Sequence, residues 1–375
     1  MRRRSFAGAA VAAAMAAALG AVPARAVSAA PPGPGTVLSL PRPAGKQTIG
    51  VTSIFLEDEG RADPWVAGEN RRLMVSLWYP ARKPSGTPAA YMTAAESRMY
   101  LAATKLNVPL DLLSGVRTHA GVDAAPAGPR GGLPLVVLSP GFGMPRATLS
   151  GIAEELASRG YAVAAIGHNH EANGISFPDG ETTGCAVCGN PDHRTVGDTR
   201  AKDVSFVLNE LTKEHPVWEG GRLVDTGRIA MVGHSAGGYS AIPAMVADPR
   251  IKAGVNMDGN FRYPNGIPVD RPFLMLGNPS HVPGGPDGTW DATWRQLTGW
   301  KRWLSVDGTD HLSFTDLAPL GKQHGRSFQE LDGDRCDAIT RAYLAAFLDT
   351  HLRGRHVPLL DGPSARYPEV RFHRP

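Results

Sequence analysis

Cysteine, net charge and long apolar runs are all scarce in this sequence. The formal charge of +4 is carried by Arg2, Arg3, Arg4 and Arg25, so the rest of the 375-residue chain is neutral. A neutral chain gives no argument for binding nucleic acid, and we expect no such partner. No run after residue 26 approaches the roughly 20 apolar residues that a membrane-spanning helix needs. These absences exclude a nucleic-acid-binding or membrane-spanning class.

The first 26 residues have the features of a cleaved signal peptide. Arginines precede an alanine-rich apolar stretch, and Ala24-Arg25-Ala26 forms an A-x-A cleavage site. Arg3-Arg4-Ser5-Phe6 also fits a twin-arginine signal. We therefore expect a secreted protein, exported by the twin-arginine route, with a flexible leader over residues 27–47 that is rich in proline, glycine and alanine.

The three cysteines are an odd number. Cys185 and Cys188 lie in a polar loop, and in an oxidising compartment we expect them to form a local disulfide. A metal site with His193 is the alternative, although these residues fall short of four zinc ligands. Cys336 has the pattern of a helix-face residue without a partner.

One segment organises the chain, the GxSxG of Gly233-His234-Ser235-Ala236-Gly237. A buried-type strand, residues 229–232, ends at this motif, and an alanine-rich helical segment follows it. This strand-turn-helix setting is the one in which a nucleophilic serine is lifted clear of the backbone. The pattern predicts that Ser235 is a nucleophile.

Strands and helices alternate on both sides of this motif. Short apolar runs predict strands at 135–138, 162–166, 253–257, 273–276 and 303–306, and amphipathic patterns predict helices near 147–159, 204–211 and 338–352. Such alternation indicates an α/β fold with a mostly parallel central sheet and helices on both faces. We assign residues 48–375 to a single domain of this kind.

The segments before the parallel region are less regular. Residues 48–58 and 72–80 predict an antiparallel pair at a sheet edge. Residues 91–116 are partly helical and apolar, and they predict a cap over the active site, a lipid-facing surface or simply a packed helix.

The partners of Ser235 should follow later strands, because functional groups gather at the carboxyl ends of parallel strands. His311 comes soon after the 303–306 strand and is the predicted base. Asp258 ends the 253–257 strand and is the predicted acid; Asp287 and Asp291 are weaker alternatives. The order Ser, Asp, His fits an α/β-hydrolase triad. The other histidines lack such a position: His168, His170, His281, His324, His351 and His356.

Neighbouring residues are expected to support these three. The backbone amides of Ala236 and Phe142 are the predicted oxyanion hole, because one follows the nucleophile and the other lies in the glycine-rich loop after the 135–138 strand. His234 is expected to support the turn at Ser235. Asp310 is expected to stabilise the loop of His311.

The chain resembles the platelet-activating factor acetylhydrolase family, which includes the plasma and type II intracellular enzymes and bacterial relatives. The matching segments, in chain order, are RRLMVSLWYP, LVVLSPGFG, ELASRGYAVAAIGH, GHSAGG, NMDGN and DGTDHLSFTD. The resemblance implies a calcium-independent serine esterase that removes short acyl groups from glycerophospholipids, and it supports Asp258 over Asp287. Two features depart from the family: SPGFG has proline where the animal enzymes have histidine, and the loop from His170 to His193 is an addition.

We therefore expect a secreted serine esterase that hydrolyses short-chain carboxylic esters, including the sn-2 acetyl ester of phospholipids like platelet-activating factor. The expected partner is a small ester or phospholipid, with transient contact to a lipid surface, and no cofactor or metal is called for. Two alternatives stay open. One is a polyester or cutin hydrolase, and the other is a binding protein that has kept the fold without catalysis.

Overall fold

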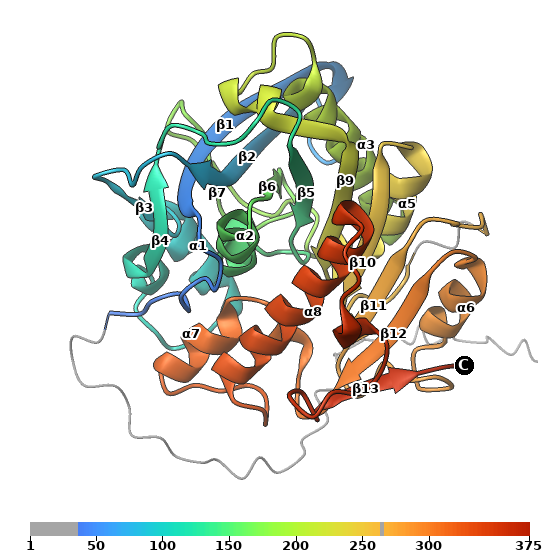
Figure 1. Ribbon diagram of the computed structural model, residues 1–375. Helices are drawn as coiled ribbons and strands as arrows, with labels where there is room; N and C mark the ends of the chain where they lie inside the picture. The colour runs from blue at the N-terminus through green and yellow to red at the C-terminus, as the bar shows by residue number, and fades with distance from the viewer. Residues whose placement is uncertain (1–36, 263–265) are drawn as a thin grey trace, which may run out of the picture.

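An eleven-stranded sheet runs through the computed structural model, which describes residues 37–262 and 266–375 (Figure 1). Its strands lie in the order β13-β12-β11-β10-β9-β5-β6-β2-β1-β4-β3. Their bounds are β1 Thr48–Ala62, β2 Asn70–Ala81, β3 Pro88–Ala90, β4 Arg117–Val122, β5 Leu133–Ser139, β6 Ala162–His168, β9 Val224–His234, β10 Ile251–Met257, β11 Phe273–Gly277, β12 Lys301–Val306 and β13 Val370–His373. A separate hairpin joins β7 (Ile175–Ser176) to β8 (Thr182–Thr183).

The centre of the sheet is parallel. Six strands, β6, β5, β9, β10, β11 and β12, pair in parallel with one another in this order. The sequences of β5 and β6 are nearly continuous apolar runs, and every residue in both is buried. Strands covered on both faces need this composition, which is why the sequence predicted them. The mostly parallel α/β sheet of the prediction is confirmed.

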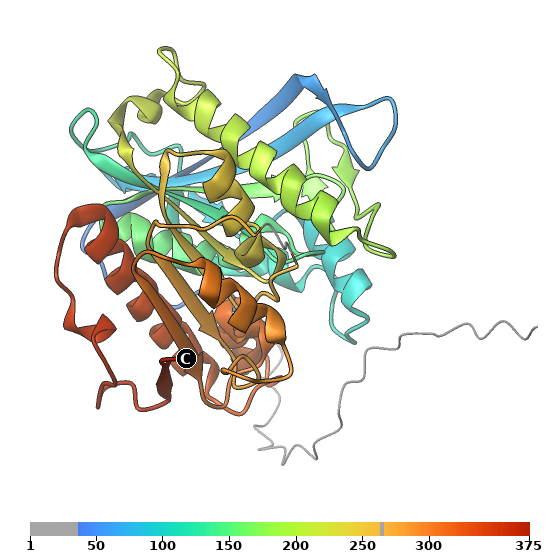
Figure 2. The same ribbon diagram turned by 90° about the vertical axis from the view of Figure 1, so that its right-hand side faces the viewer.

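Helices cover both faces of the sheet. Their bounds are α1 Ala94–Thr104, α2 Ser150–Ser158, α3 His193–Thr212, α4 Ala236–Tyr239, α5 Ala241–Ala247, α6 Gly288–Gln296, α7 Leu317–Gln323 and α8 Gly333–Arg353. Figure 2 shows α3, α5 and α6 on one face, with α8 on the other. Neighbouring strand residues alternate between the two cores: Val137 packs in the cluster that includes α3 and α5, whereas Val136 packs in the one that includes α2 and α8.

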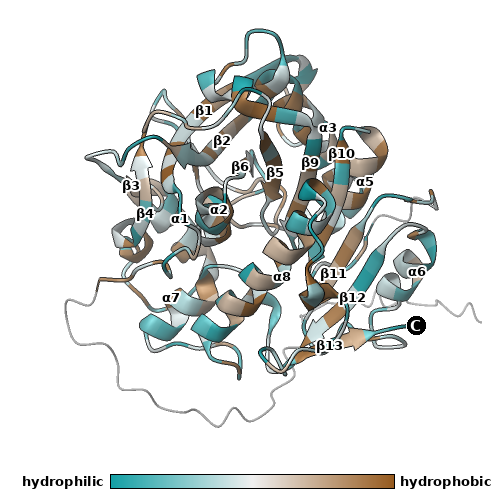
Figure 3. Cartoon of the chain, viewed as in Figure 1, coloured by the Kyte–Doolittle hydropathy of each residue, from teal (hydrophilic) through white to brown (hydrophobic). Residues whose placement is uncertain are grey.

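Figure 3 shows the hydropathy of these elements: the central strands are largely brown (hydrophobic), and many outward-facing helix positions are teal (hydrophilic).

The sheet extends further beyond β1 and β2 than expected. Strands β1 and β2 form the predicted antiparallel pair, but they do not end the sheet, because β1 also pairs with β4 and β4 pairs with β3. The prediction of a sheet edge was therefore wrong. Strand β4 has the sequence RTHAGV, which lacks the apolar run that identified the other strands. Strand β13, antiparallel to β12, was also not expected.

The last part of the predicted flexible leader, from residue 37, is packed against the domain. Residues 1–36, which include the predicted signal peptide and the first part of the leader, lie outside the described residues. From residue 37 the chain is packed rather than flexible, because Leu38 and Leu40 are buried against Tyr91 and Leu113. Leucines spaced two apart among prolines and glycines can dock as an extended segment, which composition alone does not reveal.

The predicted cap segment folds as α1 followed by the 3₁₀ helix η1 (Leu112–Gly115). Helix α1 begins with a capping box, in which Thr93 accepts a hydrogen bond from the Glu96 amide and the Glu96 side chain accepts one from the Thr93 amide. Helix α1 contributes Tyr100 and Leu101 to a small apolar cluster that also contains Met144. Among the described residues, no helix has the length and hydropathy of a membrane span.

Candidate active site

Ser235 occupies a sharp turn between β9 and α4. Its backbone dihedrals are φ 52° and ψ −115°, a conformation that non-glycine residues rarely adopt. A Cβ atom at Gly233 would collide with the backbone of Gly237, and one at Gly237 would collide with the backbone of Ser139. The two glycines of the motif therefore permit the tight turn that presents the serine.

The structure brings the three predicted residues together. Ser235 Oγ lies 2.9 Å from His311 Nε2, and His311 Nδ1 lies 2.6 Å from Asp258 Oδ2. His311 starts the 3₁₀ helix η4 (His311–Phe314) after β12, while Asp258 follows β10 directly. All three stand at the carboxyl ends of parallel strands, as expected for this kind of sheet. In this arrangement the imidazole can take a proton from the serine while the carboxylate holds its other nitrogen.

Asp258 is fully buried and receives several hydrogen bonds. The backbone amide of Asn278 donates to Oδ1 at 2.7 Å, and the Asn278 side chain donates to Oδ2 at 3.0 Å. Burial opposes ionisation of this carboxyl, but its hydrogen bonds with His281 and His311 outweigh that effect and lower its pKa. Asp258 is thus an anion with a fixed orientation.

His281 was not predicted to be part of the site. Its Nδ1 lies 2.8 Å from Asp258 Oδ1, on the opposite side of the carboxylate from His311. Two alternative acids have other contacts: Asp287 lies 3.4 Å from His281 and caps α6, and Asp291 accepts hydrogen bonds from the Gly284 amide. The available signal for His281 was its position just after β11, beside the strand that ends at Asp258.

Two residues beside Ser235 and His311 make supporting contacts: Asp310 holds the His311 loop as expected, whereas the hydrogen bond of His234 ties the turn at Ser235 to the His311 backbone. His234 Nε2 lies 2.8 Å from the backbone oxygen of His311, and the two rings lie 4.7 Å apart. Burial, and to a lesser extent the nearby His311, lowers the pKa of His234 to about 3. The His234 ring is therefore neutral, and its Nε2 donates to the His311 backbone oxygen. Asp310 caps η4 and accepts a hydrogen bond from the His311 amide at 2.5 Å.

The predicted oxyanion loop lies beside the serine. Phe142, in the loop after β5, lines the same cleft as Ser235 and His311. Ala236 is the first residue of α4, and a first-turn amide has no acceptor within its own helix. Gly143 anchors the loop, because its amide donates to Glu171 O at 2.8 Å and its carbonyl accepts from the Asn173 amide at 3.0 Å.

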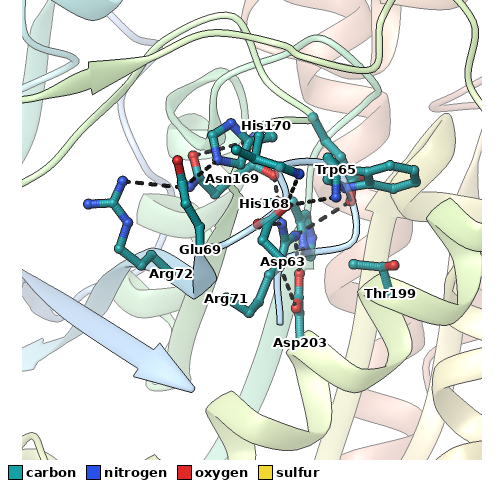
Figure 4. A network of polar contacts seen from close by, with 12 residues as sticks. Asp63, Trp65, Glu69, Arg71, Arg72, His168, Asn169, His170, Thr199 and Asp203 are labelled. Atoms are coloured by element: carbon teal, nitrogen blue, oxygen red, sulfur yellow. Dashed lines mark hydrogen bonds and ion pairs between the residues drawn. The ribbon is translucent and has the colours of Figure 1, made fainter. Parts of the chain in front are cut away.

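A buried ion network lies behind this loop. Figure 4 shows Arg71 among carboxylates: it contacts Asp63 Oδ2 at 2.9 Å and Asp203 Oδ2 at 2.7 Å. His168 Nδ1 lies 2.8 Å from the same Asp203 oxygen. Burial opposes ionisation of Asp203, yet Arg71 and His168 hold its pKa well below the usual value.

Arg200 connects this network to the oxyanion loop. Its Nε lies 2.7 Å from Glu171 Oε2, and its Nη1 donates to Pro140 O at 2.5 Å and to Ser139 Oγ at 3.2 Å. Because Glu171 also pairs with Arg71 at 3.5 Å, the chain of contacts runs from the buried ions to the backbone of the loop. Neither the arginines nor their acids were predicted, because charged side chains are usually found at the surface.

The expected local disulfide is present between Cys185 and Cys188. Both sulfur atoms are covalently bonded to each other, so they are not thiolate ligands for a metal site with His193. Cys336 is a buried free thiol, as its helical pattern suggested.

Ser235 and His311 open into a small cleft of about 210 Å³. One wall is the oxyanion loop, and the other comes from the predicted cap: the cleft is lined by Tyr100, Ala103 and Thr104 of α1, together with Phe142, Met144 and Leu312. His311 keeps 44% of its side chain exposed, whereas Asp258 has none exposed. The His311 imidazole is therefore open to a ligand, while the Asp258 carboxylate is shielded from water.

Comparison with known proteins agrees with this architecture. Residues 40–183 match the family described as "Platelet-activating factor acetylhydrolase, isoform II". A "Probable 1-alkyl-2-acetylglycerophosphocholine esterase" of Arthroderma benhamiae is 29% identical over 89% of this chain and 93% of its own length. The "Platelet-activating factor acetylhydrolase" of Gallus gallus is 25% identical over 58% of this chain and 62% of its own length.

A solved structure is also similar, and the match covers a larger share of that protein than of either relative above. The structure of a ferulic acid esterase from Streptomyces cinnamoneus superimposes with a TM-score of 0.79 at 43% sequence identity, covering 90% of this chain and 100% of that one. The names of all these relatives describe hydrolysis of a carboxylic ester. The chain is thus an α/β hydrolase similar to the platelet-activating factor acetylhydrolase family, and it is a carboxylic ester hydrolase.

Proposed function

We propose that this protein is a secreted serine esterase that cleaves short-chain carboxylic esters with Ser235 as nucleophile, His311 as base and Asp258 as the acid that orients it. One observation carries the proposal: the continuous hydrogen-bonded row from Ser235 Oγ through His311 to Asp258, with distances of 2.9 and 2.6 Å. A binding protein would have no need for an exposed base held by a buried anion.

The chemistry follows from this geometry. His311 Nε2 accepts the proton of Ser235 as Oγ attacks the ester carbonyl carbon, and the C=O electron pair moves to the oxygen. The amides of Phe142 and Ala236 donate to this oxyanion, and Asp258 stabilises the imidazolium. The intermediate then collapses, the C–O bond to the alcohol breaks, and His311 protonates the leaving oxygen. Water then attacks the acyl carbon while His311 takes its proton, the bond from this carbon to Ser235 Oγ breaks, and His311 returns the proton to Oγ as the carboxylic acid leaves.

For the substrate, we propose the sn-2 acetyl ester of phospholipids like platelet-activating factor. The names of the Arthroderma benhamiae and Gallus gallus relatives support this class. A cleft of about 210 Å³ suits a short acyl group. Leu106 and Leu110, just after α1, expose 46% and 41% of their surface, which suits transient contact with a lipid aggregate.

A second candidate is an ester of an aromatic acid. The similar Streptomyces cinnamoneus protein is named a ferulic acid esterase and is the more similar in sequence of the proteins described above. Tyr100 and Phe142 place two aromatic residues at the cleft. An aromatic acyl group can stack on such rings, so feruloyl esters belong in the same substrate panel.

The test of catalysis is the Ser235→Ala variant, assayed on p-nitrophenyl acetate and butyrate. We expect turnover to fall by about 10⁴-fold or more, because removal of a triad nucleophile leaves only the oxyanion hole and binding. Ser53→Ala, an exposed serine on β1, is the matched control and should keep full activity. Labelling by a fluorophosphonate should disappear with Ser235→Ala, and wild-type turnover in this variant would overturn the proposal.

The substrate is tested by comparing kcat/KM for a 2-acetyl phospholipid, a longer-chain phospholipid, methyl ferulate and an insoluble polyester, without added metal. We expect the acetyl phospholipid to be preferred over the longer chain. A higher kcat/KM for methyl ferulate would favour the aromatic-ester candidate, and faster release from the polyester would favour a polyester or cutin hydrolase.

Secretion is tested at the predicted signal peptide. We expect the exported protein to begin near residue 27, as determined by N-terminal sequencing. Replacing Arg3 and Arg4 by lysine should block export by the twin-arginine route. Continued export of the double variant would mean that another route is used.

A further inference from the structure

Two histidines share the carboxylate of Asp258. His311 contacts Oδ2 at 2.6 Å on the side of the cleft, and His281 contacts Oδ1 at 2.8 Å on the inner side. His311 has 44% of its side chain exposed, whereas His281 has 5% and Asp258 has none. The outer histidine faces the substrate, and the inner one is a permanent neighbour of the acid.

The surroundings of His281 provide an acceptor for each ring nitrogen. On the side opposite Asp258, its Nε2 lies 3.0 Å from Asn260 Oδ1 and 3.4 Å from Asp287 Oδ2. Its ring stacks on Trp290 of α6, with centroids 4.4 Å apart and an interplanar angle of 12°. A ring whose two nitrogens both face oxygen acceptors is satisfied only when both carry a proton.

The charges around His281 also favour its protonated form. Asp258, at the end of β10, and Asp287, at the start of α6, are the charged side chains that form ion pairs with it in the described part of the chain. Burial opposes a charge on this ring, but its bonds to Asp258 and Asp287 outweigh that effect and raise the pKa of His281 to about 9. The ring is therefore an imidazolium at neutral pH.

We infer that His281 is a positioning residue of the esterase, a protonated side chain that holds Asp258 in place and offsets part of the negative charge beside His311. The inference rests on the proposed function, because it concerns the same base and acid. Nothing in the reaction requires His281 to exchange a proton. Its effect reaches the substrate only through Asp258 and His311.

The direction of the effect follows from electrostatics. A lone buried carboxylate attracts a proton to the histidine beside it, and a protonated His311 cannot act as the base. The positive charge of His281 partly cancels the field of Asp258 at His311. Without this charge, we expect the acid limb of the kcat/KM profile to move to higher pH.

The experiment is a pH profile of kcat/KM with p-nitrophenyl acetate, read at a wavelength where nitrophenol absorbance does not depend on pH. His281→Asn keeps a neutral amide donor close to the position of Nδ1 and removes the charge. We expect its acid limb to move up by about one pH unit, while the plateau stays within about ten-fold of the wild type. His281→Leu removes the donor as well, and its plateau should be lower than that of His281→Asn.

Two results would overturn the inference. An acid limb that does not move in His281→Asn, with only a lower plateau, would give His281 a purely structural role; a shift to lower pH would contradict the electrostatic argument. These outcomes are distinct from failure of the proposed function, which is marked by full turnover in Ser235→Ala.

A second measurement does not depend on activity and decides the matter if His281→Asn fails to fold. Side-chain ¹⁵N spectra of the wild type should contain one histidine that stays doubly protonated at pH 8. In Asp287→Asn, which can still cap α6, this resonance should titrate about one pH unit lower, because one of its two carboxylate partners is gone. A neutral His281 at pH 7 in the wild type would refute the proposal.

Discussion

Asn278 donates two hydrogen bonds to the carboxylate of Asp258, although the two residues follow different strands. Asp258 directly follows β10 and Asn278 directly follows the neighbouring β11. The donors are the Asn278 amide at 2.7 Å and its side chain at 3.0 Å. Many hydrolases of this plan place the acid after the later of these strands. Here Asp258 follows the earlier strand and Asn278 follows the later one. Asn278 holds the carboxylate of Asp258, and this carboxylate contacts His311.

This relationship predicts that a carboxylate at position 278 can partly replace the one at position 258. Asp258→Asn should lower kcat/KM by about 10⁴-fold, because the amide favours the wrong tautomer of His311. Combining it with Asn278→Asp returns a carboxylate to the site from the adjacent strand end, and we expect at least about ten-fold recovery. Kinetics with p-nitrophenyl acetate would measure both. Asn278→Asp alone, which places two carboxylates together, is the control and should be less active than the wild type.

Equal activity of the Asp258→Asn single variant and the double variant would show that the end of β11 cannot support His311.

Arg200 gives a second prediction, because it connects buried acids to the oxyanion loop through Pro140 O. Arg200→Lys keeps the charge near Glu171 but loses the forked contact with the loop. We expect kcat to fall about ten-fold with little change in KM, which is less than the 10²–10³-fold typical of losing an oxyanion donor. Arg194→Lys, at an exposed position of the same helix, should leave kcat unchanged. An unaltered kcat in a folded Arg200→Lys protein would separate the network from catalysis.

The sequence predicts the parallel region well because the physics there is local. Continuous apolar runs identify strands covered on both faces, and the rule that function gathers at their carboxyl ends leads from Ser235 to His311 and Asp258. Other features depend on the assembled fold. His281 is a lone loop histidine until the β10 and β11 ends meet, and Arg71 reads as a surface residue until Asp63 and Asp203 surround it.

The buried network also predicts how stability depends on pH. Arg71 and His168 keep Asp203 ionised in the folded state, with a pKa well below its usual value, although burial opposes this. In the unfolded chain an aspartate has a pKa of about 3.9. As the pH falls below about 4, the unfolded chain takes up a proton that the folded protein does not, so the stability contributed by Asp203 is complete at neutral pH and declines in acid.

Asp203→Asn should therefore lower the free energy of unfolding by about 3–5 kcal/mol at pH 7, because it leaves Arg71 short of a buried partner. Its loss of stability between pH 5 and pH 3 should be smaller than that of the wild type. Urea unfolding at several pH values, followed by circular dichroism, measures both effects. Asp179→Asn removes the exposed ion pair with Arg72 and should cost less than about 1 kcal/mol. A parallel decline in wild type and Asp203→Asn would contradict the linkage.

The last prediction concerns the acyl group, which lies between the oxyanion loop and α1 in the proposed function. Ala103 lines the cleft with Ser235 and is exposed, so a larger side chain there narrows the cleft without disturbing the core. We expect Ala103→Trp to leave kcat/KM for p-nitrophenyl acetate within about three-fold and to lower it for methyl ferulate by about ten-fold or more, because bulk in a binding pocket discriminates by acyl size. Ala102→Trp, the exposed neighbour that does not line the cleft, is the matched control and should change neither. An equal loss of kcat/KM for both esters would mean that α1 affects Ser235 and His311 themselves. No loss for either ester would place the acyl group elsewhere, and residues 91–116 would then not act as a cap.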